Sequence, residues 1–202
     1  MILKKIEVLI DKGEFPKSEE WKKIQNEITE SIKSLEHPAG AGKFILRDEQ
    51  GKKRGKGSGV KPIRDMFCKA IEEKGWSLET KIGIAARVRP GPLDATKKVG
   101  DRLFAVEWET GNISSSHRAL NKLSLGILNR VLIGGALVLP TRKMYQYLTD
   151  RVGNVEELEP YFPLWRSLQC DEGLLVIFAV EHDAVDRNAP RIMKGTNGRA
   201  LA

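Results

Sequence analysis

Cysteine is nearly absent from this sequence of 202 residues, with only Cys68 and Cys170 present. The two lie far apart, form no CxxC pair and have no histidine cluster beside them. This pattern excludes a disulfide framework and gives no sign of a structural zinc site. Two isolated cysteines suit a reducing compartment, so we expect a cytoplasmic protein.

Long apolar runs are missing from the start of the sequence. The first ten residues, MILKKIEVLI, are interrupted by Lys4, Lys5 and Glu7. Such a segment is neither the core of a signal peptide nor a membrane span, and we expect no membrane partner.

Glycine-rich nucleotide loops are also lacking. The run GKGS at residues 55–58 has no glycine five residues earlier, which excludes a Walker A loop. No glycine-rich cofactor loop follows a predicted strand, which excludes a methyltransferase.

Positive charge is in excess, because 34 Lys and Arg against 27 Asp and Glu give a net charge of +7. This balance suits a polyanionic partner without proving one. Residues 37–59 form a glycine-rich and lysine-rich stretch around one short apolar run, which predicts an exposed, flexible basic loop with its basic part at about residues 48–61. We expect Lys56, Lys61 and the nearby Arg64 to contact phosphates, which contributes affinity without sequence information.

The hydrophobic content of 41% is sufficient for one compact domain over residues 1–202. Apolar spacing predicts helices over 19–36, from 62 to about 75, from 115 with Ser114 as N-cap, over 142–147 and over 155–161. Strands are predicted over 103–109, 131–140 and 174–180, and an extended, loosely held tail at about residues 188–202. Alternating strands and helices predict an α/β fold in which a central mixed β-sheet is flanked by helices on both faces.

Two acidic residues, Glu107 and Glu109, lie two positions apart on the strand predicted over 103–109. Period-2 geometry directs both side chains to one face, where like charges favour either solvent exposure or a shared cation. Asp94 follows a Pro-Gly-Pro turn and could reach the same place from a neighbouring strand. Three carboxylates would suit Mg²⁺, whereas an exposed strand face is the alternative for the Glu pair.

The order of Pro92, Asp94, Glu107 and Glu109 resembles the PD-(D/E)xK nuclease motif. The departure is Glu109, which stands where that motif has lysine. The runs EWETGNISSSHRALNKLSLG, from residue 107, and YLTDRVGNVEELEPYF, from residue 147, resemble the BamHI family of type II restriction endonucleases. The likeness is densest over residues 107–162, and in this family a glutamate at the lysine position is normal.

The resemblance implies a PD-(D/E)xK restriction endonuclease-like fold and hydrolysis of double-stranded DNA at the palindrome GGATCC. It implies that Asp94 and Glu107 bind metal with help from Glu79, the remaining active-site glutamate, and that Glu109 is the third catalytic acid. The alternative for Glu79 is a surface residue at a helix end. Two Mg²⁺ per site would let Glu109 orient or deprotonate the attacking water, leaving 5′-phosphate and 3′-hydroxyl ends.

The resemblance also assigns the residues that read DNA. In the major groove these are Asn112, Ser114, Arg118, Asp150 and Arg151, and in the minor groove Asn197 and Gly198. Arg suits guanine, Asn adenine, and Asp cytosine. Helix capping by Asn112 and Ser114, and a surface ion pair of Asp150 with Arg151, are the alternatives.

A palindrome cut on both strands calls for a homodimer, with the interface expected around residues 117–126 and from 145 onward. His117 is then a packing or interface residue. A separate cognate methyltransferase would protect the host DNA. A catalytically dead DNA-binding protein and a nuclease for branched or damaged DNA are the competing functions; the three acids oppose the first and the base-reading set opposes the second.

Overall fold

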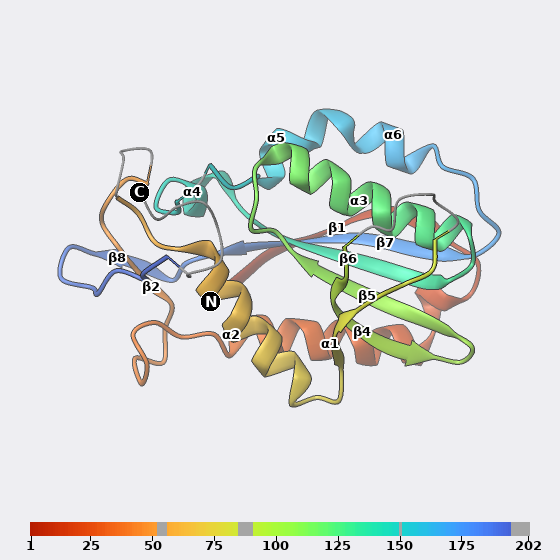
Figure 1. The fold of residues 1–202 in the computed structure, drawn as a ribbon, viewed down its shortest axis with the longest axis horizontal. Helices are drawn as coiled ribbons and strands as arrows, with labels where there is room; N and C mark the ends of the chain where they lie inside the picture. Colours follow the sequence, from red (N-terminus) through yellow and green to blue (C-terminus); the bar gives the residue numbers. More distant parts are fainter. Residues whose placement is uncertain (52–55, 85–90, 150, 195–202) are drawn as a thin grey trace.

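The computed structural model describes residues 1–51, 56–84, 91–149 and 151–194. Its centre is a six-stranded sheet in the order β1-β7-β6-β5-β4-β3 (Figure 1). The strands are β1 (Ile2–Lys12), β3 (Ser77–Thr80), β4 (Leu93–Val99), β5 (Arg102–Trp108), β6 (Leu132–Pro140) and β7 (Gly173–Glu181). The pairs β5–β6 and β6–β7 are parallel, and the other three pairs are antiparallel, so the predicted mixed sheet is confirmed.

Helices cover both faces of this sheet, as predicted. Figure 1 shows α1 and α2 on one side and α3, α5 and α6 on the other. The helices are α1 (Glu19–Lys33), α2 (Val60–Glu72), α3 (Ile113–Leu128), α4 (Arg142–Tyr145), α5 (Val155–Leu158) and α6 (Phe162–Arg166), with short 3₁₀ turns at Phe15–Lys17 and Glu159–Tyr161. Alternation along β7 sends Phe178 into the core under α1 and α2, and Ile177 into the core under α3 and α6.

The start of α3 differs from its prediction. The helix begins at Ile113, and its N-cap is Asn112 rather than Ser114. The Asn112 Oδ1 atom accepts hydrogen bonds from the backbone N–H groups of Ser114 and Ser115, at 3.1 and 3.3 Å. Asn is among the most favoured N-cap residues, so the local chemistry explains the earlier start.

The predicted exposed basic loop is only partly correct. Its apolar run is buried, with Phe44 and Leu46 fully shielded from solvent. Here β2 (Ile45–Arg47) pairs in parallel with β8 (Ala184–Asp186), a partner that local sequence does not reveal. The helix α2 also begins at Val60, inside the range assigned to the loop.

Residues 188–194 of the predicted tail are held against the molecule at two points, while four of these seven residues are exposed. Ala189 and Ile192 are buried, and the Ile192 carbonyl accepts a hydrogen bond from Gly59 N at 2.8 Å. Across the described ranges, the helices are too short or too polar to cross a bilayer.

Candidate active site

A hollow of about 630 Å³ beside β4, β5 and the first half of α3 gathers three acidic side chains. Asp94 is the second residue of β4, Glu107 is near the end of β5, and Glu109 directly follows β5. Glu109 N still donates to the Val138 carbonyl of β6 at 3.0 Å, which prolongs the extended backbone. Strand periodicity therefore brings Glu107 and Glu109 to the same hollow.

Hydrogen bonds from strand β5 and from helix α2 hold the Asp94 side chain. Its Oδ2 atom accepts a hydrogen bond from Trp108 N at 2.7 Å. Its Oδ1 atom accepts from Arg64 Nε at 3.0 Å and from Arg64 Nη2 at 2.7 Å, both from helix α2. The carboxylate orientation is thus set by one backbone group and one guanidinium, whose charge suits the anion.

Glu107 is a buried acid beside another acid. Burial and then the charge of Asp94 raise the pKa of Glu107 to about 7, and Lys122 opposes both effects. The ammonium of Lys122 forms an ion pair with Glu107 Oε1. Lys122 Nζ also donates to the carbonyls of Pro92 at 3.1 Å and Gly91 at 3.4 Å.

Glu109 is fixed through one oxygen and has the other available. Its Oε1 atom accepts a hydrogen bond from Gly111 N at 2.5 Å. Its Oε2 atom is buried and has no hydrogen-bond partner of regular geometry among the described residues. Burial raises the pKa of Glu109, against the opposing effects of the Ser116 hydroxyl and the Gly111 N–H. A buried carboxylate oxygen without a partner suits a water, a cation or a substrate group.

Glu79 does not line the hollow of the other three acids. It sits on strand β3, has a positive φ of 51°, and its side chain is 56% exposed. Its partner is Arg64 Nη2, the same group that contacts Asp94. Over the described residues, no group of three or more His, Cys, Asp or Glu side chains is arranged to hold a metal ion.

The donor chemistry nevertheless fits a hard divalent cation at Asp94 and Glu107. Carboxylate and carbonyl oxygens are the ligands that Mg²⁺ prefers, and Glu109 Oε2 adds a buried oxygen that has no regular hydrogen bond to the described residues. Burial and then repulsion by Asp94 raise the Glu107 pKa, and a shared cation would relieve that repulsion.

Three of the predicted base readers share a second hollow of about 530 Å³. Asn112, Ser114 and Arg151 line it, together with Tyr145 and Glu157. Arg118 instead lines the carboxylate hollow, and its Nη2 atom lies 3.4 Å from Ser115 Oγ. Asp150, Asn197 and Gly198 lie outside the described residues. The capping role of Asn112 is confirmed, and base reading stays a prediction.

The predicted phosphate contacts all have acidic neighbours. Lys56 Nζ lies 3.9 Å from Glu49, and Lys61 Nζ lies 2.5 Å from Asp65. Both side chains are more than a third exposed, whereas Arg64 is 17% exposed and turned toward Asp94. Lys56 and Lys61 are therefore accessible to DNA, and Arg64 is accessible only if it leaves the carboxylates.

His117 is a packing residue. Its ring meets Tyr161 edge-on at 4.6 Å between centroids and lies 5.5 Å from the Trp165 ring. Sequence reasoning missed the contacts of Lys122 and Arg64 with the acids. For Lys122 the sequence did hold a signal, because this residue lies off the apolar stripe of its helix and could therefore face a site.

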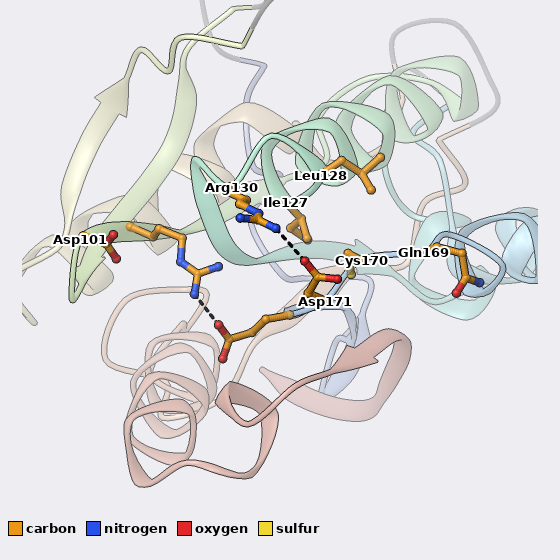
Figure 2. Close-up of a pocket in the computed structure, with 9 residues that line it drawn as sticks. Asp101, Ile127, Leu128, Arg130, Gln169, Cys170 and Asp171 are labelled. Atoms are coloured by element: carbon orange, nitrogen blue, oxygen red, sulfur yellow. Dashed lines mark hydrogen bonds and ion pairs between the residues drawn. The ribbon is translucent and has the colours of Figure 1, made fainter.

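A third hollow, of about 540 Å³, lies at the far end of β4 and α3 from the carboxylates. Figure 2 shows Arg130 directed at Asp171 across it. The ion pairs Arg130–Asp171 and Arg102–Glu172, at 2.6 and 2.5 Å, engage two of the three acids that line it, and Asp101 is the third. Guanidinium groups thus neutralise Asp171 and Glu172 in this hollow.

Comparison with known proteins gives consistent relatives. The family described as restriction endonuclease BamHI matches residues 1–199. The type II restriction enzyme OkrAI of Oceanobacter kriegii is 50% identical over 201 residues, covering 100% of both chains. The type II restriction enzyme BamHI of Bacillus amyloliquefaciens is 34% identical over 181 residues, covering 86% of this chain and 80% of that protein.

The fold is shared with a further solved structure, restriction endonuclease BglII complexed with a DNA 16-mer. It has a TM-score of 0.65 at 12% identity, covering 89% of this chain and 79% of that one. The fold likeness and the two sequence relatives confirm the resemblance that the motifs around Glu107 indicated. The chain belongs to the BamHI family of type II restriction endonucleases, which are site-specific deoxyribonucleases.

Proposed function

We propose that this chain cuts both strands of double-stranded DNA at GGATCC as a Mg²⁺-dependent homodimer, leaving 5′-phosphate and 3′-hydroxyl ends. The observation that carries the proposal is the hollow in which Asp94, Glu107 and Glu109 meet beside the start of α3. Asn112 caps that same helix and lines the adjoining hollow with Ser114 and Arg151. Catalytic and base-reading groups would thus act on one DNA segment.

The acids divide the chemistry between them. Asp94 and Glu107 would hold Mg²⁺, with two ions per site. When bound, Mg²⁺ would increase the acidity of water and neutralise charge on the phosphate and the leaving oxygen. Glu109, whose buried Oε2 atom makes no regular hydrogen bond within the described ranges, would orient the attacking water and accept its proton. A bond then forms between the water oxygen and phosphorus as the bond to the 3′ oxygen breaks.

Glu79 would assist in metal binding only after a rearrangement. It contacts Arg64 and does not line the hollow of the other acids. Its participation therefore requires the Arg64 side chain to move from between Glu79 and Asp94.

Base reading would follow from the chemistry of the side chains. Arg118 and Arg151 suit guanine, Asn112 suits adenine, and Asp150 suits cytosine, with Ser114 as an additional hydroxyl contact. Asn197 and Gly198 would read the minor groove, and Lys56, Lys61 and Arg64 would contact phosphates. The palindrome GGATCC is the one that the resemblance to the BamHI family implies, and BamHI of Bacillus amyloliquefaciens is 34% identical to this chain.

A homodimer would supply two active sites for a palindrome. Four large apolar side chains are 41–61% exposed on and beside α3 and α6, namely Leu125, Leu128, Tyr161 and Leu164. An apolar patch of this kind is typical of an interface. We further propose a cytoplasmic location and a separate cognate methyltransferase that protects the host DNA.

The first test is digestion of a plasmid with one GGATCC site, in Mg²⁺ and in EDTA, with sequencing of the ends. We expect one Mg²⁺-dependent double-strand cut. The variant Glu109→Gln should lose roughly 100-fold or more in cleavage rate because the water loses its base or orienting anion. The exposed Glu19→Gln, on α1, is the charge-matched control and should cut normally.

Other outcomes would overturn separate parts. Cuts at another fixed sequence would keep the nuclease and refute the roles given to Asn112, Arg118, Asp150 and Arg151. Binding without cutting would refute the catalytic roles of Asp94, Glu107 and Glu109 and favour a catalytically dead DNA-binding protein.

A further inference from the structure

Each of the two acids assigned to the metal already has a cation of its own in this protein. Lys122 pairs with Glu107, and Arg64 pairs with Asp94. The two cations come from opposite layers, because Lys122 projects from α3 and Arg64 from α2. Both side chains are largely shielded from solvent, with exposures of 12% and 17%.

The surroundings of Lys122 resemble the ligands of a hard metal ion. Its ammonium has three oxygen neighbours, which are the Glu107 carboxylate and the carbonyls of Pro92 and Gly91. An ammonium has three donors, so these contacts can satisfy all of them. Oxygen neighbours of this type are also those that Mg²⁺ and Ca²⁺ select.

Arg64 binds the second acid in a comparable way. Two of its nitrogens donate to Asp94 Oδ1, and Nη2 also contacts Glu79. Arg64 therefore lies between Asp94 and Glu79. It contacts Asp94 Oδ1, whereas Trp108 N donates to the other oxygen, Oδ2. While it stays, Glu79 and Asp94 have the guanidinium in common.

A divalent ion and these cations cannot share the same carboxylate oxygens, because like charges at such short distance repel strongly. Release of Lys122 and Arg64 requires another anion to receive them, since a partly buried cation without a partner is unfavourable. The DNA phosphate backbone supplies such anions at close spacing.

We propose that Lys122 and Arg64 are internal counter-ions that compete with the divalent cation for Glu107 and Asp94, and that DNA phosphates draw them away, so that DNA binding promotes metal binding. This proposal rests on the proposed function, since it takes Asp94 and Glu107 as the metal ligands. Lys122 and Arg64 are then positioning residues that delay metal binding until substrate is present.

The test measures Ca²⁺ affinity of the DNA-free protein at pH 8.5, followed by the NMR signal of the Trp108 amide. That N–H donates to Asp94 Oδ2, so it reports on the site directly. The variant Lys122→Met keeps the apolar stem and removes the charge. We expect Lys122→Met to bind Ca²⁺ about tenfold more tightly than the unmodified protein, because one competing cation is removed.

The matched control is Lys98→Met, an exposed lysine near the far end of β4. It should leave Ca²⁺ affinity unchanged. Arg64→Met, on a different helix, should also bind Ca²⁺ more tightly and decides the question if Lys122→Met does not fold. A damaged structure would weaken metal binding, so a gain in affinity is not expected from a merely structural role.

A second arm adds a 16-base-pair duplex containing GGATCC, recovered afterwards to verify that it is intact. Ca²⁺ affinity should rise in the unmodified protein and rise less in Lys122→Met, in which the acid is already released. Equal or weaker Ca²⁺ binding by both Lys122→Met and Arg64→Met would overturn the inference. If the protein cleaves DNA but the Ca²⁺ affinities do not rise, the proposed function stands and the inference fails. If the affinities rise as expected but the protein does not cleave DNA, only the proposed function is refuted.

Discussion

Glu107 is a residue whose burial conflicts with its charge. Its side chain is 10% exposed, and burial with the charge of Asp94 raises its pKa to about 7 from an ordinary value of 4.5. The folded protein therefore keeps this proton over a pH range in which the unfolded chain has lost it. Stability from this group is fully present below pH 4.5 and is lost as the pH rises toward about 7.

The variant Glu107→Gln should remove this pH dependence. In EDTA, the free energy of unfolding of Glu107→Gln minus that of the unmodified protein should increase as the pH rises from 4.5 to about 7. The gain should reach about 3 kcal/mol, since one pKa unit corresponds to about 1.4 kcal/mol. Urea unfolding at several pH values measures it, with the exposed Glu19→Gln as control. Parallel curves for Glu107→Gln and the unmodified protein would contradict the prediction.

At the scale of elements, Gly111, just before α3, connects Glu109 with the segment that is proposed to read bases. Glu109 Oε1 accepts a hydrogen bond from Gly111 N, and Gly111 O accepts one from Gly153 N at 2.9 Å. Gly153 lies two residues after Arg151 and packs closely on α3. A side chain at Gly153 would place its Cβ 2.2 Å from the buried Ser116 Oγ.

The variant Gly153→Ala should therefore displace the segment that carries Arg151. We expect the affinity for a GGATCC duplex to fall about tenfold, because one misplaced base contact is worth about 1–3 kcal/mol. Affinity for an unrelated duplex, which depends on phosphate contacts, should change much less. Binding titrations with both duplexes measure the ratio.

Gly83→Ala is the matched control for that experiment. A Cβ at Gly83 meets no atom within 4 Å. An unchanged ratio in Gly153→Ala would show that the segment tolerates the shift, and the link between α3 and base reading would be wrong.

At the scale of the whole molecule, the helices α3 and α6 lie on the side of the sheet opposite to α1 and α2 (Figure 1), and exposed apolar side chains occur on and beside them. The proposed dimer would bury them. Leu164 is 61% exposed. The variant Leu164→Asp should therefore change the stability of the single subunit little, whereas a charge buried in the interface should weaken the dimer strongly. Light scattering after size-exclusion chromatography should find a monomer, and plasmid cleavage should become slow.

The control for the dimer is Val185→Asp on β8. Val185 is 39% exposed and belongs to the small two-stranded sheet, away from α6. It should remain dimeric. A Leu164→Asp protein with the mass of a dimer would exclude this patch as the interface.

Short-range sequence patterns were enough to predict much of the fold. The apolar stripe of α1, the continuous apolar runs of β6 and β7, and the spacing of Glu107 and Glu109 are all short-range patterns. Each depends on helix or strand periodicity, which a sequence displays directly. The family motifs around α3 added the assignment of the site.

Other features depend on which segments meet in space. β2 pairs with β8 from the other end of the chain, and β1 packs as an edge strand although its sequence alternates poorly. Asn112 rather than Ser114 caps α3 because backbone geometry selects between two suitable residues. The pairing of Arg64 with Asp94 and of Lys122 with Glu107 joins residues 30 and 15 positions apart on different elements. Periodicity gives the face on which a side chain lies, but the charge that it meets there depends on how helices α2 and α3 pack against the sheet.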